Sequence, residues 1–171
     1  MNAVEQDIWT WITEFIEVNN KFYDYKFPPC PFARAARLKG LVDVKVYSNG
    51  NPYSYVKSQV EDLIAQKKFN VRVMAFPYWM RWLYPLHWAL QHLNKKIIRD
   101  DFYIQYGKIL TTVNTPYFVV IVNKLSDVLS AHESLKKTSY YNPWSHDHYE
   151  EVVVRRAKAY NKYKGNTNEM D

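Results

Sequence analysis

The one cysteine of the chain is the side chain best placed to do chemistry. Cys30 directly precedes a proline, and residues 31–39 have the composition of a short helix that ends at Gly40. Backbone N–H groups and the helix dipole at such a start stabilise a thiolate. Arg34 and Arg37, one and two turns further along, add positive charge. The pattern predicts a nucleophilic or redox thiol; the alternative is a buried cysteine that packs as a small hydrophobic side chain.

The other residues of the sequence exclude several kinds of catalytic site. Because no second cysteine exists, a disulfide cycle within the chain is excluded, and any redox role needs an external thiol. The 4 glycines never cluster, so a loop that cradles phosphate is not predicted. No serine follows a glycine-rich turn, which leaves Ser-His-Asp catalysis without support. The carboxylate pairs are adjacent in sequence and do not indicate acid–base catalysis.

Two histidines near the C-terminus form a candidate metal pair. His146 and His148 flank Asp147 in a loop directly before the last predicted helix. Such a pair can hold one edge of a metal ion, with Cys30 or Glu150 as further ligands contributed across space. The alternative is that both histidines lie at the surface around the helix cap.

Basic and aromatic residues gather toward the C-terminus. The net charge of +6 favours polyanions only where the charge is concentrated. The scattered lysine pairs fit solvated helix ends, where cations complement the dipole. The denser C-terminal cluster predicts a surface for a partner protein or a nucleic acid. Its candidate contact residues are Tyr140, Tyr141, Trp144, Arg155, Arg156, Lys158 and Lys162.

A second aromatic segment, from Tyr78 to Trp88, lies in a predicted helical region. It is a candidate stacking platform for bases or a groove for a partner. Helical spacing of its apolar residues favours packing in the core instead. The residues predicted on that apolar side are Trp79, Trp82, Leu83, Leu86, Leu90 and Leu93.

Hydrophobic periodicity and turn residues define the elements that must position these side chains. Helices are predicted over 4–18, 31–39 and 78–96, the last interrupted at Pro85, and further helices start at Pro52, Ser126 and Ser145. Strands are predicted over Val42–Val46, Phe69–Phe76, Phe102–Leu110 and Tyr117–Val122. The order from residue 42 is β-α-β-α-β-β-α. It predicts an α/β domain, with α+β as the alternative, in which helices cover a mixed sheet of about four strands.

This order is the one found in thioredoxin-like folds, with a ferredoxin-like variant as the competitor. In thioredoxin-like domains a cis-proline precedes a strand and lies against the active cysteine. Thr115 and Pro116 stand in a similar place, directly before the strand predicted at Tyr117–Val122. Pro116 is therefore predicted to shape a groove beside Cys30.

A length of 171 residues suits one domain, predicted over 1–165 and followed by a frayed tail over 166–171. No apolar run approaches the ~20 residues needed to cross a bilayer, so no membrane span is predicted. The first residues carry acids and lack a basic start before an apolar stretch, which argues against a signal peptide. A lone cysteine suits a reducing compartment. We expect a soluble cytoplasmic protein.

The sequence Cys30-Pro31-Phe32-Ala33, preceded by Trp11-Ile12-x-x-Phe15-Ile16-x-x-Asn19, resembles a bacterial domain family of unknown function (number fourteen-fifteen). In that family a helix with a tryptophan leads into a Cys-Pro-Phe-Ala box. Residues 21–27 are an insertion relative to it, and the Phe-His-Pro segment typical of its later half is absent. The resemblance implies a layout and a candidate cysteine, but no reaction.

The Cys-Pro-Phe box is also similar to that of omega-class glutathione transferases, where it opens the first helix of a thioredoxin-like domain. This more local resemblance implies a thiol-dependent transferase or reductase with glutathione as the candidate cofactor. Cys30 is then the nucleophile, Arg34 and Arg37 stabilise its thiolate, and Pro116 shapes the substrate groove. The strand expected before the cysteine is not evident, and no second all-helical domain follows. The alternative function is a non-enzymatic binding protein that uses the basic, aromatic C-terminal surface.

Overall fold

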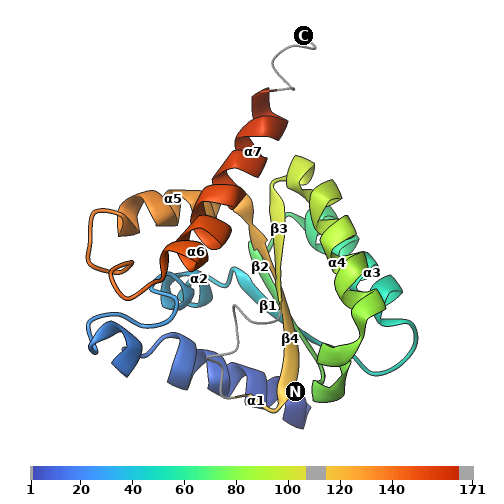
Figure 1. The fold of residues 1–171 in the computed structure, drawn as a ribbon. Coiled ribbons are helices and arrows are strands. Elements are labelled where there is room, and N and C mark those ends of the chain that lie inside the picture. Colours follow the sequence, from blue (N-terminus) through green and yellow to red (C-terminus); the bar gives the residue numbers. More distant parts are fainter. Residues whose placement is uncertain (1, 107–114, 166–171) are drawn as a thin grey trace.

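Four strands form one mixed sheet in the computed structural model, which describes residues 2–106 and 115–165 (Figure 1). They are β1 (Val42–Val46), β2 (Val71–Pro77), β3 (Phe102–Tyr106) and β4 (Tyr117–Lys124). The sheet order is β1-β2-β4-β3: β1 and β2 run parallel, and β4 is antiparallel to both of its neighbours. The predicted mixed sheet, and the element order from residue 42, are confirmed.

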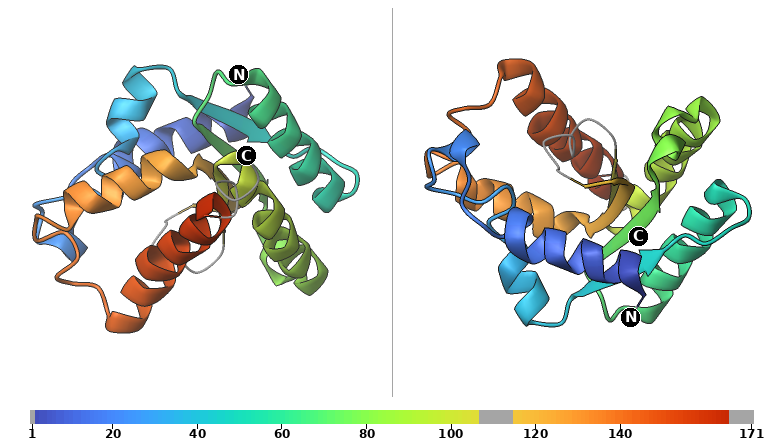
Figure 2. Two further views of the ribbon diagram at one scale, coloured as in Figure 1. Left: turned by 90° about the horizontal axis from the view of Figure 1, so that it is seen from above. Right: turned by 90° about the horizontal axis from the view of Figure 1, so that it is seen from below.

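Helices cover both faces of this sheet (Figure 2). One face carries α3 (Pro52–Gln66) and α4 (Tyr84–Ile97), and the other carries α1 (Ala3–Trp11) and α5 (Leu125–Leu135). Shorter segments join them: η1 (Ile12–Ile16), η2 (Lys21–Tyr23), α2 (Ala33–Leu38), η3 (Tyr78–Trp82), η4 (Ile98–Asp100), α6 (His146–Tyr149) and η6 (Glu150–Val154). The last helix, α7 (Arg155–Gly165), projects from the body of the protein (Figure 1). No helix in the described part of the chain is long and apolar enough to cross a membrane.

Strand alternation divides the interior into two cores. In β2, Met74 and Phe76 point to the face under α3 and α4, whereas Val73 and Ala75 point to the face under α1. The four side chains are almost completely buried. Because both faces of β2 are covered, its sequence from Val73 to Pro77 is a continuous apolar run rather than an alternating one.

A fully buried cation sits within this otherwise apolar strand. Arg72 pairs with Asp43 on the neighbouring strand, with 2.6 Å between its Nη2 and Oδ2, and with Asp62 of α3 at 2.7 Å. Its Nη1 also donates to the backbone oxygen of Gln59 at 2.6 Å. This hydrogen-bonded pairing lowers the pKa of Asp62. Arg72 thus joins β1, β2 and α3 through one guanidinium.

The predicted helix over 78–96 is two elements that meet at Leu83. A 3₁₀ segment, η3, precedes α4, and Pro85 occupies the first turn of α4, where a missing N–H costs nothing. Pro85 therefore starts a helix instead of kinking one. The predicted apolar side divides accordingly: Leu86, Leu90 and Leu93 are buried, whereas the tryptophans Trp79 and Trp82 are exposed.

Several other boundaries differ in detail. The helix predicted over 4–18 becomes π-helical from Ile12 to Ile16. Ser126 does not cap α5; its N–H and hydroxyl instead donate to Asp101, at 2.8 and 2.5 Å. Asn51 and Ser145 cap their helices as predicted. Positions 107–110 of the predicted third strand, and the tail predicted over 166–171, lie outside the described residues.

Candidate functional site

The surroundings of the Cys30 thiol favour its protonated form. Cys30 is exposed as a residue, yet neighbouring atoms desolvate its sulfur and raise the pKa of the thiol. Hydrogen bonds from the backbone at Phe32 and Ala33 oppose this shift, and the charge of Glu17 adds to it. The α-helix begins only at Ala33 and spans six residues. These surroundings weigh against the expected stabilisation of a thiolate, which stays a prediction.

Of the two arginines predicted to assist Cys30, one forms an ion pair with an acid and the other is exposed to solvent. Arg37 donates from Nε and Nη2 to the two carboxylate oxygens of Glu17, at 2.7 and 2.8 Å. Its charge is therefore neutralised by an acid that itself disfavours the thiolate. Arg34 is exposed to solvent. Neither guanidinium is among the groups that shift the pKa of Cys30.

We therefore predict that Cys30 reacts slowly with iodoacetamide. At pH 7 the folded protein should alkylate several-fold more slowly than the same protein in denaturant, because less of the thiol is ionised. The rate should rise only above the pKa of an ordinary thiol, about 8.5. Labelling measured from pH 6 to 10 by mass spectrometry checks this. Faster labelling of the folded than of the denatured protein at pH 7 contradicts it.

The contacts of Cys30 and of Tyr117, the residue after Pro116, fall on different parts of the first helical segment. The Cys30 N–H donates to the carbonyl of Ile16 at 3.2 Å, where η1 ends. The hydroxyl of Tyr117 donates to Asp7 at 2.7 Å, in α1. No cis peptide bond occurs in the described chain. A groove shared by Cys30 and Pro116 stays a prediction.

The predicted metal pair is part of a helix cap. The ring of His148 packs on Trp144, with 4.3 Å between the ring centroids, and the backbone N–H of His148 donates to the hydroxyl of Ser145. His146 is exposed. Within residues 2–106 and 115–165, no three side chains of metal-ligating type come together. A metal centre at this pair has no third ligand in the described structure.

The three aromatic residues predicted on a C-terminal surface are packed side chains. Tyr140 is buried and stacks on Tyr23, with ring centroids 4.6 Å apart. Its hydroxyl accepts from Tyr23 at 3.1 Å and donates to the carbonyl of Pro29 at 2.6 Å. Trp144 donates to the Tyr23 hydroxyl, and Tyr141 packs edge-on against both Tyr140 and Trp144. These rings attach the N-terminal loop to the segment after α5. Tyr140 is buried and is unavailable to a partner, contrary to prediction, whereas Tyr141 and Trp144 are half-buried and their place on a partner surface stays a prediction.

The four basic residues predicted beside them separate into two groups. Arg155, Lys158 and Lys162 are exposed, and Lys158 pairs with Glu150 at 3.3 Å. Arg156 is buried under Tyr103 of β3, its guanidinium carbon 4.3 Å from the ring centroid. Arg156 is therefore unavailable to a macromolecular partner, contrary to prediction.

Five large aromatic side chains are exposed on η3 and the start of α4, and we call them the aromatic face. They are Tyr78, Trp79, Trp82, Tyr84 and Trp88, with exposed fractions of 47%, 59%, 68%, 87% and 70%. Soluble proteins seldom leave so much aromatic surface in one place unless it contacts something. Arg81 lies among these rings, 4.6 Å from the centroid of Tyr78 and 4.5 Å from that of Trp82.

The packing under the aromatic face holds it rigidly. Met80 is buried and anchors η3 to the body of the protein. His87 bonds the carbonyl of Arg81 through its Nε2 at 2.6 Å, and the hydroxyl of Tyr106 donates to the carbonyl of His87 at 3.1 Å. These bonds tie η3, α4 and β3 together, so the exposed rings sit on fixed backbone.

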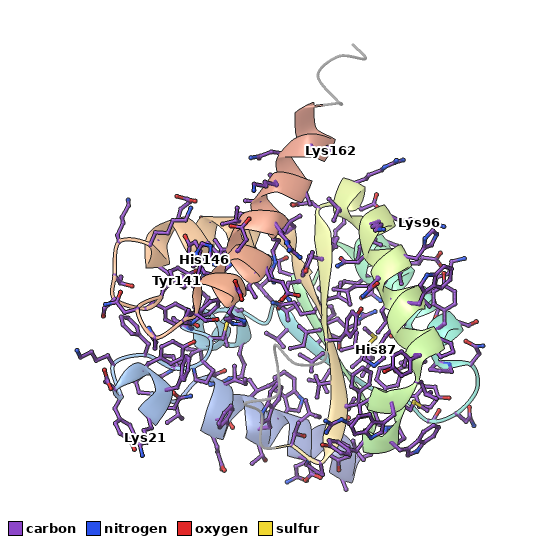
Figure 3. The ribbon with its side chains drawn as sticks, viewed as in Figure 1. Lys21, His87, Lys96, Tyr141, His146 and Lys162 are labelled. Atoms are coloured by element: carbon purple, nitrogen blue, oxygen red, sulfur yellow. The ribbon has the colours of Figure 1, made fainter. Side chains whose placement is uncertain are left out.

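A run of basic side chains continues along the same exposed side of α4, and we call it the basic end. It comprises His92, Lys95, Lys96 and Arg99, which line a hollow of about 460 Å³. His92 stacks on Trp88, with ring planes 10° apart, and so links the basic end to the aromatic face. Figure 3 shows His87 and Lys96 near the two ends of this helix.

Helical geometry explains why one helix carries both a core stripe and this outer stripe. Leu86, Leu90, Leu93 and Ile97 follow the i, i+4, i+7, i+11 spacing and are buried against the sheet. Tyr84, Trp88 and Lys95 follow the same spacing two residues earlier or later and are exposed, and Arg99 is exposed in η4, just after α4. The sequence carried a further signal for this surface: no aspartate or glutamate occurs between Asp62 and Asp100.

No protein-family model matches this chain, and no curated protein or solved structure matches it either. Functional inference therefore rests on the residues themselves.

Proposed function

We propose that this protein is a binding protein that holds single-stranded nucleic acid across the aromatic face and the basic end. The observation that carries the proposal is the outward display of five exposed rings beside four basic side chains, three on α4 and Arg99 on η4. Unpaired bases stack on aromatic rings, and phosphates pair with cations. The outer side of α4 carries aromatic rings for the bases and cations for the phosphates, so it can bind both parts of a single strand.

Charge favours a nucleic acid over a protein partner at this surface. A protein interface typically presents aromatic residues with a rim of mixed charge. Here the chain that forms the surface carries charge of one sign, because Arg81 lies among the rings and no acid occurs in the sequence from Leu63 to Arg99. In double-stranded DNA the bases are stacked on one another and expose only their edges, in the grooves. Exposed indoles stack on the faces of bases, which are free only in a single strand.

The test is the anisotropy of a fluorescein-labelled 12-nucleotide single strand, titrated with protein at several salt concentrations. If three or four cations each neutralise one phosphate, the logarithm of the association constant should fall against the logarithm of salt concentration with a slope of about −2 to −3. Replacing Lys95 and Lys96 with glutamine should reduce the slope by about 1.4, since each phosphate contact contributes about 0.7.

A matched control is Lys57→Gln, which removes an exposed lysine of α3 that pairs with Glu61 at 3.7 Å. That variant should retain the slope of the unmodified protein. Binding that ignores salt, or no binding to any single strand at low salt, contradicts the proposed function.

The thiol-dependent, glutathione-linked activity has weaker support. It rests on the order of elements that resembles thioredoxin-like folds and on the Cys-Pro-Phe box. The raised pKa of Cys30 and the Glu17 partner of Arg37 both weigh against it. A lone thiol kept protonated suits the cytoplasmic location that we propose for a nucleic-acid-binding protein.

A further inference from the structure

Buried and half-buried arginines of this protein use one edge of the guanidinium in the same way. Arg37 donates from Nε and Nη2 to Glu17 at 2.7 and 2.8 Å. Arg72 places its Nε and Nη2 at 2.8 and 2.6 Å from one oxygen of Asp43, Oδ2; the Nε contact is a hydrogen bond and the Nη2 contact is an ion pair without hydrogen-bond geometry. Nε–H and Nη2–H point in the same direction, which makes this edge the natural partner of a carboxylate.

Arg156 presents the same edge with no carboxylate on it. The residue is 3% exposed, and its Nε and Nη2 are buried without a carboxylate or carbonyl partner in the described parts of the chain. Its remaining nitrogen, Nη1, lies 3.5 Å from Nε2 of His132. Tyr103 covers the guanidinium, with 4.3 Å to its ring centroid, and a hydrogen bond with the Tyr103 side chain favours the charged form of Arg156. None of these neighbours is an anion.

The uncharged state of His132 follows from its surroundings. Burial and the positive charge of Arg156 lower the pKa of His132 to about 4. The imidazole is thus neutral at pH 7, and Nε2 accepts a hydrogen bond from Arg156 while Nδ1–H donates to the hydroxyl of Tyr141. His132 and Tyr141 orient the guanidinium without neutralising it.

A buried guanidinium with an unpaired edge is costly, because it loses hydration and gains no counter-charge. From this contrast with Arg37 and Arg72, we infer that the Nε/Nη2 edge of Arg156 binds the carboxylate of a small organic acid. Tyr103 and Tyr141 are half-buried, so the edge lies just beneath the surface between β3 and the junction of η6 with α7. Binding here is independent of the proposed nucleic-acid surface, which lies on α4 over the opposite face of the sheet.

The same chemistry has a second source, because Glu169 and Asp171 follow α7 in the sequence. Residues 107–114 contain no aspartate or glutamate and supply no carboxylate. The double variant Glu169→Gln/Asp171→Asn separates the two sources, since it removes both side-chain acids and leaves Arg156 intact.

The experiment follows the Nε–H signals of the arginines by ¹H–¹⁵N NMR while acetate replaces chloride at constant ionic strength. The Arg156 signal should move saturably, and the Arg37 and Arg72 signals, already paired with carboxylates, should stay in place. Arg156→Lys keeps a positive charge and loses the two-nitrogen edge. This variant should lack the moving signal and should lose the acetate-dependent rise in Tm, which we expect to be a few degrees in the unmodified protein.

Three results overturn the inference. One is an Arg156 signal that does not move, or moves without saturating, up to molar acetate. A second is an acetate-dependent Tm that persists unchanged in Arg156→Lys. The third is an Arg156 signal that shifts to a new position in Glu169→Gln/Asp171→Asn without acetate, because the tail of the chain is then the partner. A saturable acetate response retained in that double variant supports an external carboxylate.

Discussion

Replacing both Trp82 and Trp88 with alanine should weaken the binding of a 12-nucleotide single strand by about 100-fold. Each base stacked on an aromatic ring contributes about 1–3 kcal/mol, and the two variants together remove two such platforms. Both indoles are more than two-thirds exposed, so their loss leaves no buried cavity and should leave the free energy of unfolding nearly unchanged. Anisotropy titrations and urea unfolding measure the two quantities.

The matched control for these tryptophans is Tyr25→Asn. Tyr25 is 66% exposed and lies in the N-terminal loop, away from α4. Its φ of 57° is tolerated by asparagine. This variant should bind the strand as well as the unmodified protein does. Equal affinity of the tryptophan variant and the Tyr25 variant contradicts a stacking role for the aromatic face.

The free energy of unfolding should fall by about 2 kcal/mol as the pH is lowered from 7.5 to 5, because of His132 alone. Its pKa is about 4 in the folded protein and about 6.5 in the unfolded chain. Between these values the unfolded state binds a proton that the folded state refuses, so stability declines as the pH falls through this window. Above about pH 6.5 both states are neutral and the contribution disappears.

Urea unfolding of the unmodified protein and of His132→Gln measures this effect. Glutamine does not titrate, so the variant should lose about 2 kcal/mol less than the unmodified protein over the same pH range, whatever its stability at pH 7.5. The lower limit of pH 5 avoids the titration of Asp62 and Glu133, whose pKa values are lowered by Arg72 and Lys136. Parallel pH profiles for the two proteins contradict a buried, neutral His132.

Local patterns were enough to predict the sheet and most helix starts. The valines of β1 alternate with charged residues, and Asn51 before Pro52 is a strong helix start, so both elements were predicted where they occur. Ser126 was misassigned because the acceptor for its N–H is Asp101, which lies on a different element. A cap of that kind has no local signature.

The aromatic face was misinterpreted because one helical period was applied across a change of helix type. A 3₁₀ segment turns once every three residues and an α-helix every 3.6, so the apolar side of α4 does not extend through Leu83 into η3. Trp79 and Trp82 therefore point to solvent. The absence of acids from Leu63 to Arg99 was visible in the sequence and marks the same surface independently.

The C-terminal residues could not be placed from sequence because their partners are distant. Tyr140 and Trp144 contact Tyr23, and Arg156 contacts Tyr103 and His132. A π-helical segment, η6, ends at Val154, two residues before Arg156, and changes which side of the last helix faces inward. The composition of the C-terminal residues shows only that they are basic and aromatic.

The strand order β1-β2-β4-β3 also constrains how the chain reaches its native state. The central pairing joins residues as far apart as Val71 and Asn123, and α1 packs on the sheet surface that this pairing completes. Closing so long a loop costs chain entropy before its contacts form, which slows folding. During synthesis β2 leaves the ribosome before β4 does. The backbone N–H and C=O groups on the edge that pairs with β4 stay unpaired until Tyr117–Lys124 has been added. The first half of the chain is thus made well before the strand that it needs to become stable.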